Sequence, residues 1–187
     1  MSAFHKSDSL LGIDTTRCER FAWHMPDPPI SQVELPSIGL VAGLSPEDRS
    51  MLASYGHFSF LHEGEEIIHQ GQPQGSLYFV LSGLLHAKRS DSGREILVGE
   101  IHIGESFGEV NVFDPGEASA TVVAALPSQL WSIEGADLQA FVSAYPEAGV
   151  HLVCGVASVL SKRLRRVSEQ LVGKVEYESL ISELKPG

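Results

Sequence analysis

The sequence is poor in cysteine and has no long apolar run, and each absence removes a class of protein. The 187 residues include two cysteines, Cys18 and Cys154, which lie far apart and form no CxxC pair. This favours free thiols in a reducing compartment over a disulfide scaffold or a zinc ribbon. No stretch approaches the roughly 20 apolar residues of a membrane helix, and the first ten residues lack an apolar segment of signal-peptide length. We therefore expect a cytoplasmic protein without membrane contact.

The motifs of common enzymes are missing as well. Eight histidines are present, but none forms the HxH pair of a cupin metal site, and His62 and His69 would lie on opposite faces of an unbroken strand. The nucleophile elbow, the P-loop and the dinucleotide-binding fingerprint are absent. Cys154 stands among apolar residues of a helical stretch, where a buried thiol would be inert. The sequence thus predicts a protein that is not an enzyme and holds no metal.

Charge of one sign dominates the middle of the chain. The net charge is −11, and from Leu44 to Asp137 four basic residues stand against fourteen acidic ones. Such a surface argues against nonspecific nucleic-acid binding. One stretch is basic, with Lys162, Arg163, Arg165 and Arg166 in five positions. We interpret it as a solvated helix face, with a docking surface for an acidic partner, or for this chain's own acidic middle, as the alternative.

Three regions follow from the pattern along the chain. Residues 1–42 contain four clustered prolines and no sustained period, so we expect an extended or partly disordered extension, or a partner-binding segment. Residues 43–145 begin with a short helix, for which Ser45 is the cap, Pro46 the first residue and Asp48 the capping-box acid. Short strands punctuated by glycines then run from His57 to Gly135, which indicates an all-β sandwich or barrel.

Residues 146–187 are predicted to be helical. A short helix over residues 136–145 precedes them, with Leu138, Phe141 and Val142 on one face. The long helix, to about Val172, carries apolar residues at alternating steps of three and four, which is a heptad seam and favours a homodimer. Gly173 is expected to interrupt it before a short terminal helix. The seam residues are Val150, Val153, Ala157, Leu160, Leu164, Val167 and Leu171.

Two runs resemble the cyclic-nucleotide-binding domain, the sensor domain of the catabolite activator proteins. They are GEEIIHQGQPQGSLYFVLSG, from Gly64 to Gly83, and GESFGEVNVFDPGEASATVVA, from Gly104 to Ala124. The second resembles that family's phosphate-binding cassette. The resemblance implies a mainly β fold with α elements, a double-stranded β-helix (a β-roll or jelly roll) flanked by an N-terminal helix and C-terminal helices. It also implies a possible cyclic nucleotide ligand and no other cofactor.

The resemblance also assigns site residues. Gly108 would let backbone approach the ligand, and Glu109 would accept a hydrogen bond from the ribose hydroxyl. Val110, Ser119 and Ala120 continue the cassette, and Ser168 falls where the long helix could contact a ligand or be a plain exposed residue.

The cassette departs from the family at one position. Ala118 stands where the family has its phosphate-binding arginine, and no lysine or arginine occurs between Gly99 and Ser161. A charge-assisted hydrogen bond is worth roughly 1.5–3 kcal/mol, so its loss costs about one to two decades of affinity. A cation from another strand, Lys88 or Arg94, is the remaining source of compensation.

These features of the sequence are compatible with two functions. The first is a dimeric regulator that binds a cyclic nucleotide weakly, or a different small ligand, in the roll. The second is a ligand-independent protein–protein interaction module with a degenerate nucleotide pocket, docking through residues 1–42 or the C-terminal helix. Sixteen residues follow Leu171, too few for the helix-turn-helix of the activator proteins, so we expect no DNA binding by the chain itself.

Overall fold

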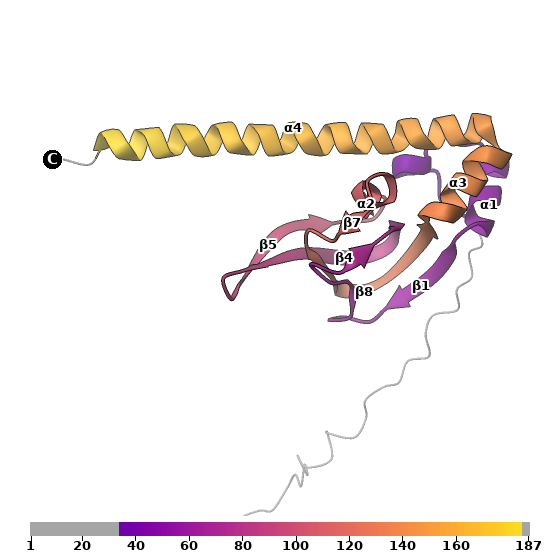
Figure 1. Ribbon diagram of the computed structural model, residues 1–187, viewed down its shortest axis with the longest axis horizontal. Helices are drawn as coiled ribbons and strands as arrows, with labels where there is room; N and C mark the ends of the chain where they lie inside the picture. The colour runs from indigo at the N-terminus through magenta and orange to yellow at the C-terminus, as the bar shows by residue number, and fades with distance from the viewer. Residues whose placement is uncertain (1–33, 185–187) are drawn as a thin grey trace, which may run out of the picture.

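A β-roll lies beneath one very long helix that extends far past it (Figure 1). The computed structural model describes residues 34–184, with side chains to residue 172 apart from Gln170. Cys18 and residues 1–33 of the predicted N-terminal extension fall outside the described residues, as do residues 185–187.

The N-terminal helix forms as its cap predicts. A short 3₁₀ turn, η2 (Gly39–Val41), leads into α1 (Pro46–Ser54), and Ser45 Oγ accepts a hydrogen bond from the Asp48 amide at 3.1 Å. Proline at the first position needs no amide partner there. The predicted start of this helix is confirmed, and Leu52 on its inner side is fully buried.

The roll is built from eight antiparallel strands. The main sheet has the order β1-β8-β4-β5, with β2 added to β8 and β6 to β4, while β3 pairs with β7 separately. The strands are β1 (His57–Leu61), β2 (Glu66–Ile68), β3 (Pro73–Gln74), β4 (Ser76–Asp91), β5 (Arg94–Ile101), β6 (Ser106–Phe107), β7 (Gly116–Glu117) and β8 (Thr121–Glu134).

Strands β4 and β8 are each longer than the sequence suggests. The expected short strands punctuated by glycines would end at Gly83, whereas the chain continues there through a bulge, with register shifts on either side. Gly83 has φ +90°, and an added Cβ would lie 2.2 Å from Ser128 Oγ on β8. The glycine therefore bends one continuous strand and does not end it.

Two apolar clusters lie on the two faces of this sheet. One packs Leu77, Phe79 and Trp131 against the helices, and the Trp131 indole donates to the Ala53 carbonyl at 3.3 Å. The other fills the roll interior and includes Leu85, Phe107 and Ala118. The alternation of strand side chains thus serves both faces of one sheet.

Two helices close the chain, α3 (Gly135–Ala144) and α4 (Pro146–Leu184). The three residues predicted to share one face of α3 all contact the core, with Leu138 and Phe141 buried and Val142 partly buried. The prediction of an interruption at Gly173 is wrong, because α4 runs through it. One glycine inside a helix costs only about 1 kcal/mol and leaves the hydrogen-bond ladder intact. Cys154 is exposed on α4 and not a buried packing thiol.

Candidate functional site

The cassette places a glycine and a glutamate at one sharp turn. Gly108 follows β6 with φ +81° and caps α2 (Glu109–Phe113). An added Cβ would lie 2.3 Å from the Ser76 carbonyl oxygen. Both the left-handed conformation and the close backbone contact require glycine here. The turn directs the Glu109 side chain toward the interior of the protein, and this residue is only 1% exposed.

The buried glutamate is bound by an arginine from α4. Arg163 Nη1 donates to Glu109 Oε1, and Nη2 of the same guanidinium donates to the Ser106 carbonyl oxygen. The second carboxylate oxygen, Oε2, and the Ser106 hydroxyl have no hydrogen-bond partner although both are buried. A buried polar atom without a partner costs about 1–3 kcal/mol, so these two atoms suit a polar ligand group.

The preferred interpretation of the basic stretch as a solvated helix face does not hold for Arg163, whose contact with Glu109 fits the alternative, docking on this chain's own acidic middle. The sequence pattern that indicates a contact of Arg163 with the roll is a second helical stripe. It is distinct from the seam and lies on the side of α4 that faces the roll. Ala148, Leu152 and Val156 are buried there, Val159 packs against the core, and Arg163 follows four residues later. The period of 3.6 continues this stripe to the cassette.

The family's phosphate position holds no cation in this chain. Ala118 is 6% exposed and belongs to the apolar cluster inside the roll. Its amide donates to the Gln72 carbonyl oxygen at 2.9 Å, and its own carbonyl accepts from the Gly71 amide at 2.9 Å. Its methyl group is thus fixed in the core and offers nothing to an anion.

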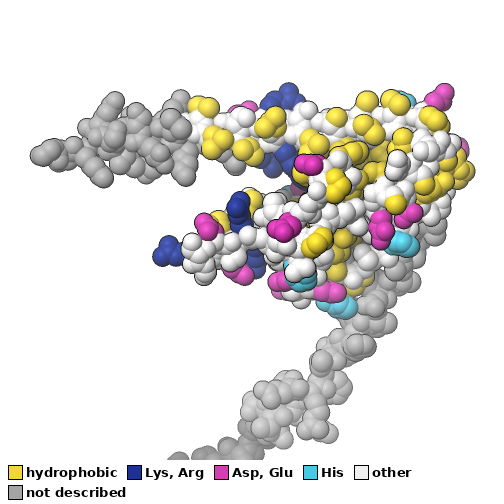
Figure 2. All heavy atoms as spheres, viewed as in Figure 1, with side chains coloured by type: hydrophobic (Ala, Val, Ile, Leu, Met, Phe, Trp, Pro, Cys, Tyr) yellow, Lys and Arg dark blue, Asp and Glu magenta, His cyan; other side chains and the backbone are white. Residues whose placement is uncertain are grey.

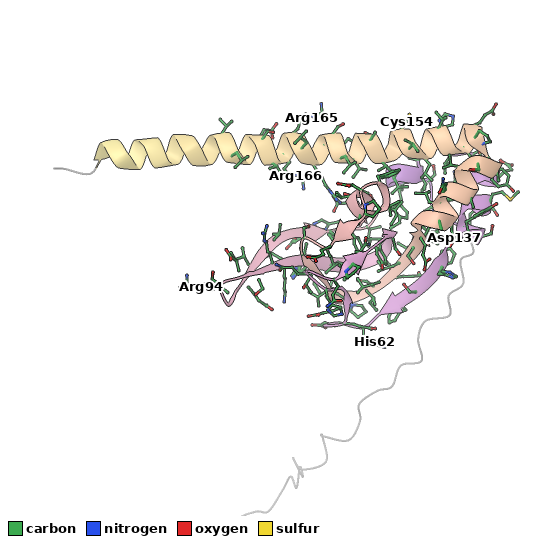
Figure 3. The ribbon with its side chains drawn as sticks, in the orientation of Figure 1. His62, Arg94, Asp137, Cys154, Arg165 and Arg166 are labelled. Atoms are coloured by element: carbon green, nitrogen blue, oxygen red, sulfur yellow. The ribbon has the colours of Figure 1, made fainter. Side chains whose placement is uncertain are left out.

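The other predicted cassette residues lie around this turn with differing access. Val110 is 56% exposed on α2, Ser119 is exposed, and Ala120 is half-buried. Neither strand cation replaces the arginine in this arrangement. Lys88 pairs with Glu95 at 3.7 Å, and Arg94 lies at the tip of the β4–β5 hairpin, away from α2 (Figure 3).

A small polar cavity flanks the cassette on the side of Gln74 and Tyr78. Its volume is about 180 Å³, below the roughly 300 Å³ at which small-molecule pockets begin. The Tyr78 ring stacks on Phe107 with centroids 4.8 Å apart. Burial raises the pKa of Tyr78 above its usual 10.0, as does Glu134, while a hydrogen bond from Ser76 opposes the rise.

The seam residues of α4 are mostly exposed. Leu164 is 68% exposed, Val167 50% and Leu171 58%, and Ala157 is exposed while Leu160 is half-buried. Val150 and Val153 are exposed as well. Ser168 is exposed, and its hydroxyl donates back to the Leu164 carbonyl oxygen at 2.9 Å. The described chain therefore leaves most of the seam uncovered.

Between residues 34 and 184 no group of three histidine, cysteine or acidic side chains is arranged to hold a metal. In the same part of the chain, no helix is both long and apolar enough to span a membrane.

Comparison with known proteins gives a consistent result. The family model for the cyclic nucleotide-binding domain matches residues 59–145. The chain is 32% identical to the cyclic AMP receptor protein of Thermus thermophilus over 133 residues, covering 71% of this chain and 60% of that protein.

Solved structures agree. The N-terminal domain of a transcriptional regulator from Streptomyces coelicolor is 30% identical with a TM-score of 0.59, and the match covers 71% of this chain and 90% of that one. The Thermus thermophilus catabolite activator protein is 31% identical with a TM-score of 0.63, over 71% of this chain and 61% of that one.

The chain spans about 60% of the length of the full-length relatives it matches. The part that the family model matches is the β-roll with its cassette and α3. On the Gly108–Glu109 turn, the roll topology and these matches, the chain belongs to the cyclic-nucleotide-binding domain family of the catabolite activator protein type.

Proposed function

We propose that this chain is a non-enzymatic regulatory module in which a small ligand in the roll controls α4. One observation carries the proposal, namely the contact of Arg163 on α4 with the buried carboxylate of Glu109. It joins the family's ligand-binding glutamate directly to the long helix. A ligand that engages Glu109 must therefore change or reinforce the same contact.

The ligand we propose is a hydroxyl-bearing nucleotide, a cyclic nucleotide being the first candidate. Glu109 Oε2 and Ser106 Oγ are buried and unpartnered, and a ribose hydroxyl can donate to the first and bond to the second. The similarity to a cyclic AMP receptor protein supports this class. Because Ala118 provides no phosphate donor, we expect affinity about one to two decades below that of a cassette with arginine.

Regulation requires that the ligand distinguish two positions of α4. A ligand shifts a conformational equilibrium only by its difference in affinity for the two states. The inner part of α4 is packed on the core through Leu152 and Val156. Beyond residue 160, the described side chains of α4 are all exposed except that of Arg163, which is half-buried. We propose that the outer segment of α4, residues 160–172, moves when the Glu109–Arg163 contact changes.

We further propose that α4 forms a homodimer through its seam. Its heptad spacing and the exposure of Leu164, Val167 and Leu171 support a second copy of α4 as the occupant. The β4–β5 hairpin below it also exposes Ile96, Leu97 and Val98, each more than half. An exposed apolar set of this kind on two neighbouring elements is typical of an interface.

Protein partners, rather than DNA, are the proposed targets of this module. The net charge is −11, and a surface of this charge repels the phosphate backbone of a nucleic acid. The outer segment of α4 is the part of the described chain that would pass on the signal.

The test is calorimetric titration with cyclic AMP and cyclic GMP, combined with amide hydrogen exchange of residues 156–172. We expect binding that changes exchange in this segment and is lost in Glu109→Ala. Glu63→Ala, an exposed acidic position in the turn after β1, is the charge-matched control and should bind normally. If neither nucleotide binds at millimolar concentration, the ligand-responsive function is wrong and the ligand-independent interaction module takes its place.

A further inference from the structure

The side of α4 that faces the roll changes from apolar to basic where the helix leaves the core. Leu152 and Val156 on this side are buried. Arg163 comes next at the cassette, and Arg166 follows three residues later. In Figure 3 Arg166 points toward the roll side of α4, while Arg165 points away from it. Two consecutive steps on this side of α4 thus carry guanidinium groups, and the first of them contacts the ligand turn at Glu109.

A hollow that the roll does not fill lies below this part of α4. Figure 2 shows it between the described end of α4, up to residue 172, and the β4–β5 hairpin, with Lys and Arg side chains on both of its sides. In a chain of net charge −11, this concentration of positive charge is local. Field lines in such a recess attract an anion more strongly than an open surface does.

Arg163 keeps donors available for a ligand. Its guanidinium has five N–H groups, and the structure uses one to Glu109 and one to the Ser106 carbonyl oxygen. Close by, the Glu109 and Ser106 side chains are each 1% exposed and each has an unpartnered oxygen. The unpartnered oxygens of Glu109 and Ser106 can bind a hydroxyl group, and the free N–H groups of Arg163 can bind an anion. Both kinds of group lie side by side, as recognition of a sugar phosphate requires.

We infer that Arg163 and Arg166 of α4 bind the phosphate of the ligand in place of the arginine that position 118 lacks. The inference rests on the proposed function and specifies its chemistry. The anion is then held by the moving helix and not by the cassette. Removal of the ligand's charge consequently weakens both its binding and its effect on α4.

The experiment compares an anionic and a neutral ligand of the same base and sugar. Cyclic AMP and adenosine are titrated into the full chain, its Arg166→Ala and Arg163→Gln variants, and Arg165→Ala as the matched control on the opposite side of α4. We expect the wild type to favour cyclic AMP by about tenfold or more, and the preference to fall with added salt. Arg166→Ala, at an exposed position that should not affect folding, should lower this ratio several-fold, and Arg163→Gln should bring it close to one.

The remaining outcomes each decide the matter. Equal affinity for adenosine and cyclic AMP in the wild type overturns the inference and leaves the ligand-responsive function standing. A preference for cyclic AMP that survives both arginine variants also overturns it, because the anion is then held elsewhere. Binding of cyclic AMP by Ala118→Arg but not by the wild type shows an intact pocket whose helix arginines do not act on the phosphate. If no variant binds either ligand, the inference and the proposed function both fail.

Discussion

Gly108 shows how one residue positions the site. Its left-handed φ of +81° lets the backbone turn from β6 into α2, and the Ser76 carbonyl oxygen occupies the place of a side chain. The turn buries Glu109 within reach of α4, so the conformation of the glycine and the position of the carboxylate are linked.

Replacement of Gly108 by alanine should therefore destabilise the roll. A non-glycine residue in a strained conformation costs about 1–3 kcal/mol, and the contact with the Ser76 oxygen adds to it. Urea unfolding measures the loss. Gly64→Ala, with a similar φ of +83° but open space around it, separates the conformational cost from the contact. Equal losses in the two variants would contradict the importance of the contact.

Tyr78 gives the protein a pH dependence on the alkaline side. Burial, the largest cause, raises the pKa of its phenol above 10.0 in the folded state. The neutral form is thus favoured by folding, and the stabilisation is complete below the unfolded pKa and lost as the pH rises through the folded one. We expect the free energy of unfolding to fall from about pH 10 upward.

The measurement is urea unfolding at a series of alkaline pH values, with phenolate absorbance recorded in parallel. Tyr78→Phe should lose part of the alkaline decline. An unchanged decline in this variant would assign it to other groups.

Helix α4 depends on small residues where it meets the rest of the chain. Gly155 lies against η2, and a Cβ there would be 2.2 Å from the Leu40 carbonyl oxygen. That close approach sets the line of the helix over the cassette, and through it the position of Arg163.

Gly155→Ala should destabilise the protein by about 1–3 kcal/mol although alanine is the better helix former. The backbone oxygen of Leu40 cannot yield without moving η2 or α4, so the Glu109–Arg163 contact should loosen as well. Thermal unfolding and hydrogen exchange of α4 measure both effects. Gly43→Ala is the control, and it should leave the stability nearly unchanged because no atom lies within 4 Å of the added Cβ. If Gly155→Ala is as stable as the wild type and hydrogen exchange in α4 is unchanged, the close packing of α4 on η2 is contradicted.

Strands and helices were predictable to different extents. The capped start of α1 and the period of α3 and α4 depend on local hydrogen bonds and repeat spacing, so they could be read correctly. The continuity of β4 through Gly83 and of α4 through Gly173 could not. In the first case the deciding neighbour, Ser128, is distant in sequence, and in the second a single glycine carries too small a penalty to stop a helix.

For the molecule as a whole, the exposed seam predicts dependence on protein concentration. A protein that folds together with its partner gains stability by mass action, so the melting temperature should rise with concentration if α4 pairs with a second copy. Leu164→Glu places a charge in the seam and should raise the dimer dissociation constant by more than tenfold.

Sedimentation equilibrium measures this directly. Ser158→Glu, exposed on α4 and outside the seam residues, is the control and should leave the association unchanged. A wild type that stays monomeric at all concentrations would remove the dimer from the proposed function.

Local patterns in the sequence were sufficient for the all-β class of the middle region, the start of α1 and the helical periods of α3 and α4. The resemblance of two short runs to the family supplied the roll, the cassette turn at Gly108 and the missing arginine at position 118. All of these features depend on residues that are close together in the chain. The partner of Glu109 required the folded chain. Arg163 lies 54 positions along the chain from Glu109, and only the packing of α4 on η2 and the core brings the two charges together at a buried point.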